Sequence, residues 1–157
     1  MSSILIALSL WLHAIGTVAL IGYYLLLALI YIPVLKNRPD GAGGAMLSEI
    51  SKRSRLWLYI SMLIFLITGS TLTLADPNYL GLADFGNFWS NLMLIKHLLI
   101  LGMVAIGFWF NAILRVGPAM SSNSGAELGF KRFGWYVNAM AITGVLVLLL
   151  TAVAQVK

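Results

Sequence analysis

Cysteine is absent from this chain of 157 residues. Its absence excludes disulfide bonds, thiolate metal sites and haem attached covalently through Cys-x-x-Cys-His. Charged residues are scarce, at 10% of the chain, whereas a soluble domain carries about 25%. No Asp or Glu lies inside the long apolar runs, which argues against a proton-coupled transporter, because such proteins carry buried carboxylates. Hydrolase signatures, phosphate-binding loops and zinc motifs are also missing.

Long hydrophobic stretches dominate what is present, and 61% of the residues are hydrophobic. Since a spanning helix needs about 20 consecutive apolar residues, four stretches qualify: residues 4–35, 56–75, 88–114 and 133–156. We therefore expect one transmembrane domain over residues 1–157, an all-α four-helix bundle surrounded by membrane lipid. The first stretch is too long for a signal peptide and is expected to be a retained helix. The glycine-rich residues 41–45 are predicted to form a flexible linker.

Basic residues are concentrated in two connections between the apolar stretches. Eight of the ten lysines and arginines lie after the first or the third stretch: Lys36, Arg38, Lys52, Arg53, Arg55, Arg115, Lys131 and Arg132. The positive-inside rule places these connections in the cytoplasm and both termini outside the cell (inner or plasma) membrane. The net charge of +5 thus comes from basic residues that flank membrane helices, and no nucleic-acid partner is expected.

The two halves of the chain present their uncommon residues in the same order. Each half has a histidine, a proline, a basic connection and then Ile-Thr-Gly: His13, Pro33 and residues 67–69 in the first half, His97, Pro118 and residues 142–144 in the second. This order favours two parallel repeats of a helical hairpin, related by an axis along the membrane normal. The alternative is that apolar helices resemble one another by composition alone.

The only two histidines, His13 and His97, lie inside the first and third apolar stretches. Each is about nine residues, or roughly 14 Å, from the outer end of its helix. Because these helices run in the same direction, both rings are expected at one depth in the outer half of the membrane. Two facing imidazoles can provide both axial ligands of a haem iron, and an ionisable residue in a membrane marks a candidate functional site. The alternative is that each histidine simply bonds another helix.

Small and polar residues are predicted near the same depth. Gly69 and Gly144, on the second and fourth helices, would leave room for a flat macrocycle. Thr17 follows the first histidine by one turn, and Thr68 and Thr143 are predicted to donate to the second nitrogen of a histidine ring. Glycine and threonine are also common at ordinary helix contacts in membranes, so a packing role stays open.

Lys96 is the third unusual residue, because it lies next to a histidine inside an apolar stretch. Its ammonium group is expected to pair either with Asp76 or Asp84 of the outer connection, or with an acidic group such as a haem propionate.

Copper is the alternative to haem. Met93 and His97 are four residues apart and therefore share a helix face, and thioether and imidazole ligands suit Cu(I). With His13 they would form a three-residue copper site. A methionine on an apolar face usually serves packing.

Several short features carry a family resemblance. They are Ile-Thr-Gly at residues 67–69, an outer connection over 76–86, Trp89, Leu-x-x-x-Lys over 92–96, and the basic pair at 131–132. Over residues 55–154 the chain resembles the membrane domain of the CopD-type copper-resistance family, which implies a helical membrane fold and copper handling. Through His13 and Lys96 it is similar, more distantly, to the HemJ-type protoporphyrinogen oxidase family, which implies haem binding.

These features predict a small membrane protein similar to a cytochrome b, with one haem b between His13 and His97 near the outer face. It would exchange electrons with a quinone or a redox partner protein. One haem near one face does not carry electrons across the whole bilayer, so we expect an oligomer or a subunit of a complex rather than a stand-alone enzyme. The alternatives are a copper-handling protein and a structural subunit without a cofactor.

Overall fold

Helices account for nearly all of the chain that the computed structural model describes, which is residues 2–36, 42–81, 86–109 and 126–156. The elements in chain order are α1 (Ser3–Leu26), the π-helical turn η1 (Leu27–Tyr31), α2 (Ile32–Lys36), α3 (Ala42–Ala75), α4 (Phe88–Phe108) and α6 (Ala126–Gln155). No strand occurs in these ranges. The all-α four-helix bundle predicted from the sequence is confirmed.

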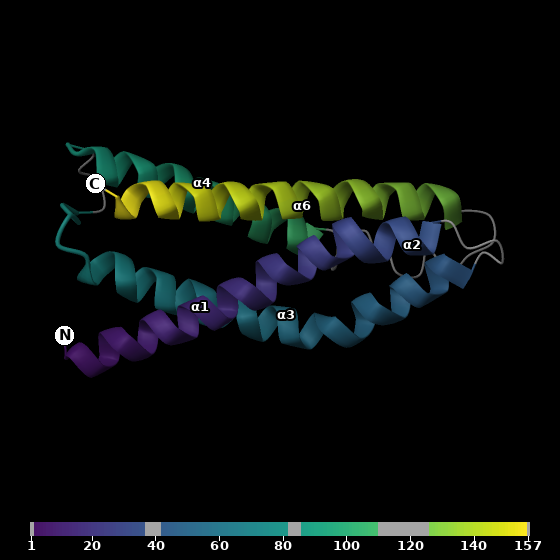
Figure 1. Ribbon diagram of the computed structural model, residues 1–157, viewed down its shortest axis with the longest axis horizontal. Coiled ribbons are helices and arrows are strands. Elements are labelled where there is room, and N and C mark those ends of the chain that lie inside the picture. The colour runs from purple at the N-terminus through teal and green to yellow at the C-terminus, as the bar shows by residue number, and fades with distance from the viewer. Residues whose placement is uncertain (1, 37–41, 82–85, 110–125, 157) are drawn as a thin grey trace.

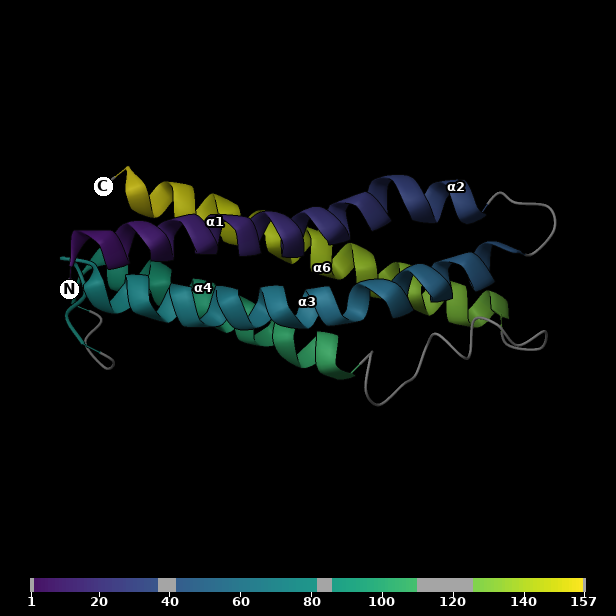
Figure 2. The same cartoon turned by 90° about the horizontal axis from the view of Figure 1, so that it is seen from below.

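The long helices run alternately up and down, so the N- and C-termini lie at one end of the bundle (Figure 1). We call this the terminal end, and the opposite one the basic end, because most of the described lysines and arginines lie toward it. α1 packs on α3 and on α6, and α4 packs on α6, whereas α3 and α4 make little contact with each other. The bundle therefore consists of two hairpins, α1–α3 and α4–α6 (Figures 1 and 2).

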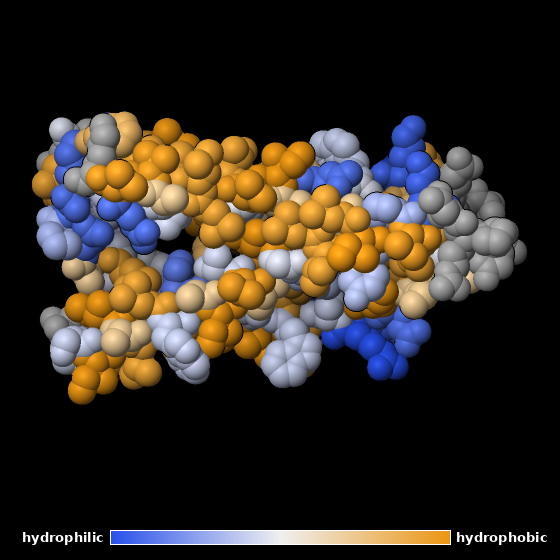
Figure 3. Space-filling model, in the orientation of Figure 1, coloured by the Kyte–Doolittle hydropathy of each residue, from blue (hydrophilic) through white to orange (hydrophobic). Residues whose placement is uncertain are grey.

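The outer surface of the bundle is apolar. Four helical segments are long and apolar enough to cross a membrane, and large side chains such as Leu29, Trp57 and Leu101 are exposed. Figure 3 shows apolar residues over most of the visible middle of the molecule. Apolar exposure on this scale is stable in lipid and not in water, so the chain is an integral membrane protein.

Two buried clusters hold the helices together. The larger one lies toward the basic end and contains Tyr24, Leu27, Leu35, Leu47, Phe133, Tyr136, Val137, Met140 and Ala141. Within it, the hydroxyl groups of Tyr24 and Tyr136 are hydrogen-bonded at 2.8 Å and connect α1 to α6. The smaller cluster consists of Phe65, Ile100 and Val147, one each from α3, α4 and α6.

The second helix begins earlier than predicted. Residues 42–45, predicted to be part of a flexible linker, form the first turn of α3. The reason is tertiary, because Gly43 is packed so closely on α2 that a Cβ there would collide with the carbonyl oxygen of Leu35. The last helix likewise begins at Ala126 rather than near 133, since helices continue past the apolar run that crosses the hydrocarbon. Gly41 and residues 110–114 lie outside the described ranges.

Candidate cofactor site

A cavity of about 100 Å³ lies between the two hairpins, toward the terminal end, and all four long helices contribute to its lining. Figure 3 shows the surface hollowed between the hairpins at this end. We call it the histidine cavity. Five residues that the sequence analysis selected lie together around it: His13, Thr17, Gly69, Lys96 and His97.

The His13 ring is held in one orientation by two residues of α3. Its Nδ1 atom lies 2.9 Å from the Thr68 hydroxyl oxygen, and that hydroxyl donates its own hydrogen to the Ile64 carbonyl oxygen at 2.6 Å. Thr68 therefore accepts from His13, which places the imidazole hydrogen on Nδ1. The ring also stacks on Phe65, with centroids 4.5 Å apart. Thr68 was predicted to be the donor of this hydrogen bond. Thr68 is indeed the partner of the ring, but His13 is the donor.

The His97 ring also carries its hydrogen on Nδ1, but a different kind of group bonds it there. Its Nδ1 atom lies 2.6 Å from the backbone carbonyl oxygen of Met93, one turn earlier on α4. A carbonyl oxygen only accepts hydrogen bonds, so Nδ1 carries the hydrogen here as well. Thr143 was predicted to bond a histidine ring, whereas the partner of His97 is the backbone carbonyl oxygen of Met93.

Both histidines therefore have the lone pair of Nε2 available for a metal, while Nδ1–H is fixed by a hydrogen bond. This is the arrangement in which proteins normally present histidine to a metal. A porphyrin supplies four nitrogen ligands to its iron, so two imidazoles complete the coordination. The described residues contain no group of three or more His, Cys, Asp or Glu side chains close enough to hold an ion, and an axial pair does not require one.

The two glycines predicted near the cofactor have different surroundings. A Cβ on Gly69 would lie 3.1 Å from Cε1 of His13, so glycine is needed for the ring to stand where it does. A Cβ on Gly144 would lie 3.1 Å from the side chain of Ile21, and Gly144 is not among the residues that line the histidine cavity. Gly144 thus allows α6 to approach α1, and it does not make room for a ligand.

Lys96 lines the cavity without forming an ion pair to Asp76. The Asp76 carboxylate instead accepts hydrogen bonds from the backbone and side chain of Asn78, at 2.9 and 3.0 Å. Asp84, its other predicted partner, lies outside the described residues. Asp76 still attracts the Lys96 ammonium group electrostatically, and Lys96 borders the cavity, where an acidic group of a ligand would meet it.

Met93 is buried, and it is not among the residues that line the histidine cavity. Its carbonyl oxygen orients His97, while its side chain packs in the bundle. Thr17, in contrast, lines the cavity, and its hydroxyl donates to the carbonyl oxygen of His13 at 2.7 Å.

Several lining residues were missed by the sequence analysis. Phe65 and Thr73 of α3 lie four residues before and four residues after the predicted Gly69, and all three line the cavity. This spacing places side chains on one helix face, so the stripe was visible in the sequence. Thr151 of α6 was not recognisable, because which face of that helix turns inward depends on its packing.

Comparisons of this chain with protein-family models, with curated proteins and with solved structures find no match.

Proposed function

We propose that this membrane protein binds one haem b between His13 and His97 and transfers electrons. The observation that carries the proposal is the shared state of the two rings. Both line one cavity, and both have Nδ1–H engaged and Nε2 available.

The residues around the histidine cavity have the chemistry that a haem needs, but the cavity itself is small. Gly69 leaves space beside the Cε1 edge of His13, and Lys96 offers a charge to a propionate. The cavity of about 100 Å³ is smaller than the roughly 300–1,000 Å³ that a drug-sized ligand occupies. A macrocycle therefore requires the two hairpins to separate at the terminal end. Because α3 and α4 make little contact with each other, such a movement would mainly disturb the packing of α1 on α6.

Each described residue has a definite role in this proposal. The Nε2 atoms of His13 and His97 would hold the iron, and their Nδ1–H bonds make those nitrogens better donors. The iron would supply one-electron redox chemistry, and the surrounding apolar residues exclude water from it. The partner is a quinone or another redox protein, and the chain would act as an oligomer or a subunit of a complex. The basic residues support a cytoplasmic basic end, which puts the site near the outer face.

The absorption spectrum of purified protein, loaded with haem where necessary, tests the proposal. A bis-histidine haem is low-spin and gives a sharp Soret band and sharp α and β bands on reduction. His13→Ala and His97→Ala should each abolish the low-spin form. Met93→Leu is the matched control, because it keeps the carbonyl oxygen that orients His97. A protein that takes up no haem, or one whose low-spin spectrum survives both alanine substitutions, contradicts the proposal.

Copper is the second candidate, and the size of the cavity favours it. A single ion fits in about 100 Å³ without any movement of the hairpins, and two imidazole nitrogens suit Cu(I). The CopD-type resemblance supports this candidate, as the HemJ-type resemblance supports haem. Because the Met93 side chain is not part of the lining, the ligands would be His13 and His97. Stoichiometric copper without a Soret band would select copper over haem.

A further inference from the structure

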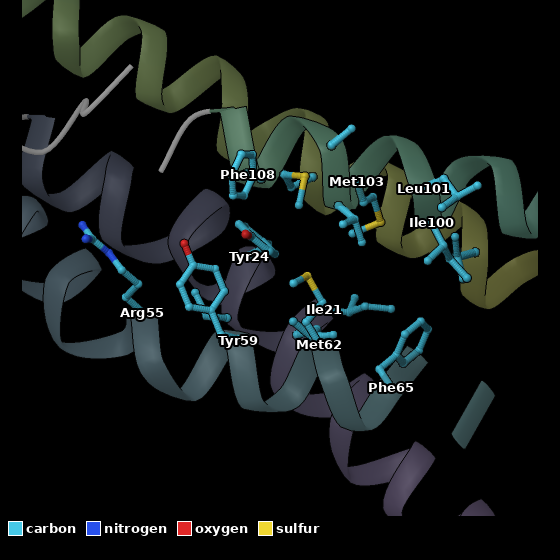
Figure 4. A pocket seen from close by; sticks show the side chains of 17 residues that line it. Ile21, Tyr24, Arg55, Tyr59, Met62, Phe65, Ile100, Leu101, Met103 and Phe108 are labelled. Atoms are coloured by element: carbon cyan, nitrogen blue, oxygen red, sulfur yellow. The ribbon is translucent and has the colours of Figure 1, made fainter. Parts of the chain in front are cut away.

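A second and larger cavity, of about 420 Å³, lies deeper in the bundle, toward the basic end. It is bordered mainly by α3 and α4 (Figure 4), the two helices that make little contact with each other. Most of its lining is aliphatic, aromatic or methionine side chain, including Met62, Met103 and Phe108. We call it the apolar cavity. Its volume is within the range of about 300–1,000 Å³ that is usual for small-molecule sites.

The polar groups of the apolar cavity are gathered at one end. Arg55 and Tyr59 are four residues apart on α3 and share a helix face, and Tyr24 of α1 lies at the same end of the cavity. In Figure 4 the Tyr59 hydroxyl points toward this end. Neither Arg55 nor Tyr59 is hydrogen-bonded to another described side chain. Their guanidinium and hydroxyl groups are therefore donors that a ligand can use.

The geometry points to a binding site for an isoprenoid quinone in the apolar cavity, with its ring at Tyr59 and Arg55 and its tail along α3 and α4 toward Phe65. A quinone ring presents two carbonyl oxygens, which accept hydrogen bonds and carry no charge. The cavity complements this chemistry, because none of the described residues that line it is acidic and its polar end offers donors beside aromatic rings. From Arg55 to Phe65 the lining runs ten residues of α3, or about 15 Å, enough for a ring and the first isoprene units.

A quinone suits the apolar cavity better than the chain of a phospholipid does. A phosphate carries a full negative charge and prefers several cationic partners, and among the described residues that line the cavity Arg55 is the only basic one. An acyl chain also gives no reason for a tyrosine hydroxyl at the polar end of the cavity. The lipid-facing seam between α3 and α4 is a path by which a quinone could enter from the membrane.

The apolar cavity shares a wall with the histidine cavity. Phe65, Ile100 and Val147 line both, and the ring of Phe65 stacks on His13. A quinone in the apolar cavity would therefore lie close to a group held by the histidines. That this quinone is the redox partner rests on the proposed function, whereas its binding rests on the apolar cavity alone.

Quinone content and quinone binding test the inference. Full-length protein is purified in a mild detergent, its bound lipids are extracted and quantified, and decylubiquinone is titrated while tryptophan fluorescence is followed. We expect about one quinone per chain and a saturable single site. Tyr59→Phe should weaken decylubiquinone binding about tenfold, as expected for one lost hydrogen bond. Tyr31→Phe, on η1 outside the lining, should leave the affinity unchanged.

A cavity-filling variant provides the second measurement. Met62→Trp should abolish binding, because the larger side chain occupies the cavity, whereas Leu63→Trp, which is exposed to lipid, should not. Extraction of phospholipid without quinone, or affinities that are the same in Tyr59→Phe, Met62→Trp and their controls, would overturn the inference. Binding is also measured in His13→Ala. Quinone binding that His13→Ala retains shows that the site does not depend on haem. Parent protein that binds quinone but takes up no haem would leave this inference standing and remove the proposed function.

Discussion

At the residue scale, His13 and His97 both carry the ring hydrogen on Nδ1, although different kinds of contact hold them. His13 uses a threonine hydroxyl on the neighbouring helix, while His97 uses the backbone of its own helix. The Thr68 hydroxyl already donates its hydrogen to the Ile64 carbonyl oxygen, and the Met93 partner is a carbonyl oxygen, so both accept at Nδ1 and the free nitrogen is Nε2. Fixing the tautomer in this way lowers the cost of binding a metal, because the ring need not reorient.

The spacing between Gly69 and His13 leads to a prediction. Gly69→Ala would place a methyl group 3.1 Å from Cε1 of His13, so the ring must shift away from its position. Displaced ligands bind less well, and changes next to metal ligands typically cost about tenfold or more in affinity. We expect retention of haem, or of copper, to fall by at least about that factor in a competition assay with a chelator or apo-acceptor.

The control is Gly102→Ala on α4, where an added Cβ would meet nothing within 4 Å. If both alanine variants retain the ligand as the parent protein does, His13 does not hold it in the position described.

At the element scale, glycines decide how closely the helices approach one another. Gly16 faces the Ser61 carbonyl oxygen and Phe65 on α3, Gly43 faces Leu35 on α2, and Gly144 faces Ile21 on α1. In membranes, where apolar helices gain little by leaving lipid, close packing at small residues is a main source of helix association. Gly16 and Gly144 therefore explain most directly why α1 is the helix on which α3 and α6 pack, and Gly43 explains the close approach of α3 to α2.

The contact at Gly43 should be the least tolerant of change. Gly43→Ala improves helix propensity by about 1 kcal/mol, yet its methyl group would strike the backbone of Leu35, which cannot rotate away. Overpacking of this kind costs about 1–3 kcal/mol, so we expect a lower unfolding midpoint in detergent. Gly22→Ala, which meets nothing within 4 Å, should leave the midpoint equal or higher. Equal midpoints for the two variants would show that α2 and α3 are not packed as described.

At the scale of the whole molecule, the bundle is not evenly packed. α1 and α6 form the joint between the hairpins, and the opposite seam between α3 and α4 is open enough to contain the apolar cavity. The two halves also differ in detail, since Gly69 faces a histidine and Gly144 an isoleucine. The internal repeat stays a prediction.

The absence of cysteine makes the orientation of the molecule easy to measure. Single cysteines are introduced as Ser2→Cys at the terminal end and Ala45→Cys at the basic end, both at exposed positions. A membrane-impermeant maleimide should label Ser2→Cys in intact cells and Ala45→Cys only after permeabilisation, because basic segments stay in the cytoplasm. The reverse pattern would place the histidine cavity near the cytoplasmic face.

The sequence by itself determined the fold class, because helices are the form in which long apolar runs satisfy their own backbone in lipid. It also identified His13 and His97, since ionisable residues stand out in such runs. Their meeting in one cavity followed from helix direction and depth, which residue counting provides. The early start of α3 did not follow, because it depends on the contact between Gly43 and Leu35.

Only the tertiary structure decided which face of each helix turns inward. Gly144 serves the packing of α6 on α1, whereas Gly69 leaves space for the His13 ring, although both glycines end an Ile-Thr-Gly sequence. The tertiary structure also excluded the side chain of Met93 from the histidine cavity and made its carbonyl oxygen the partner of His97. The apolar cavity is likewise a product of packing, because it exists where α3 and α4 fail to meet. In lipid, the type of an apolar side chain does not show which helix it contacts. The rotation of each helix is therefore set by the contacts that it makes.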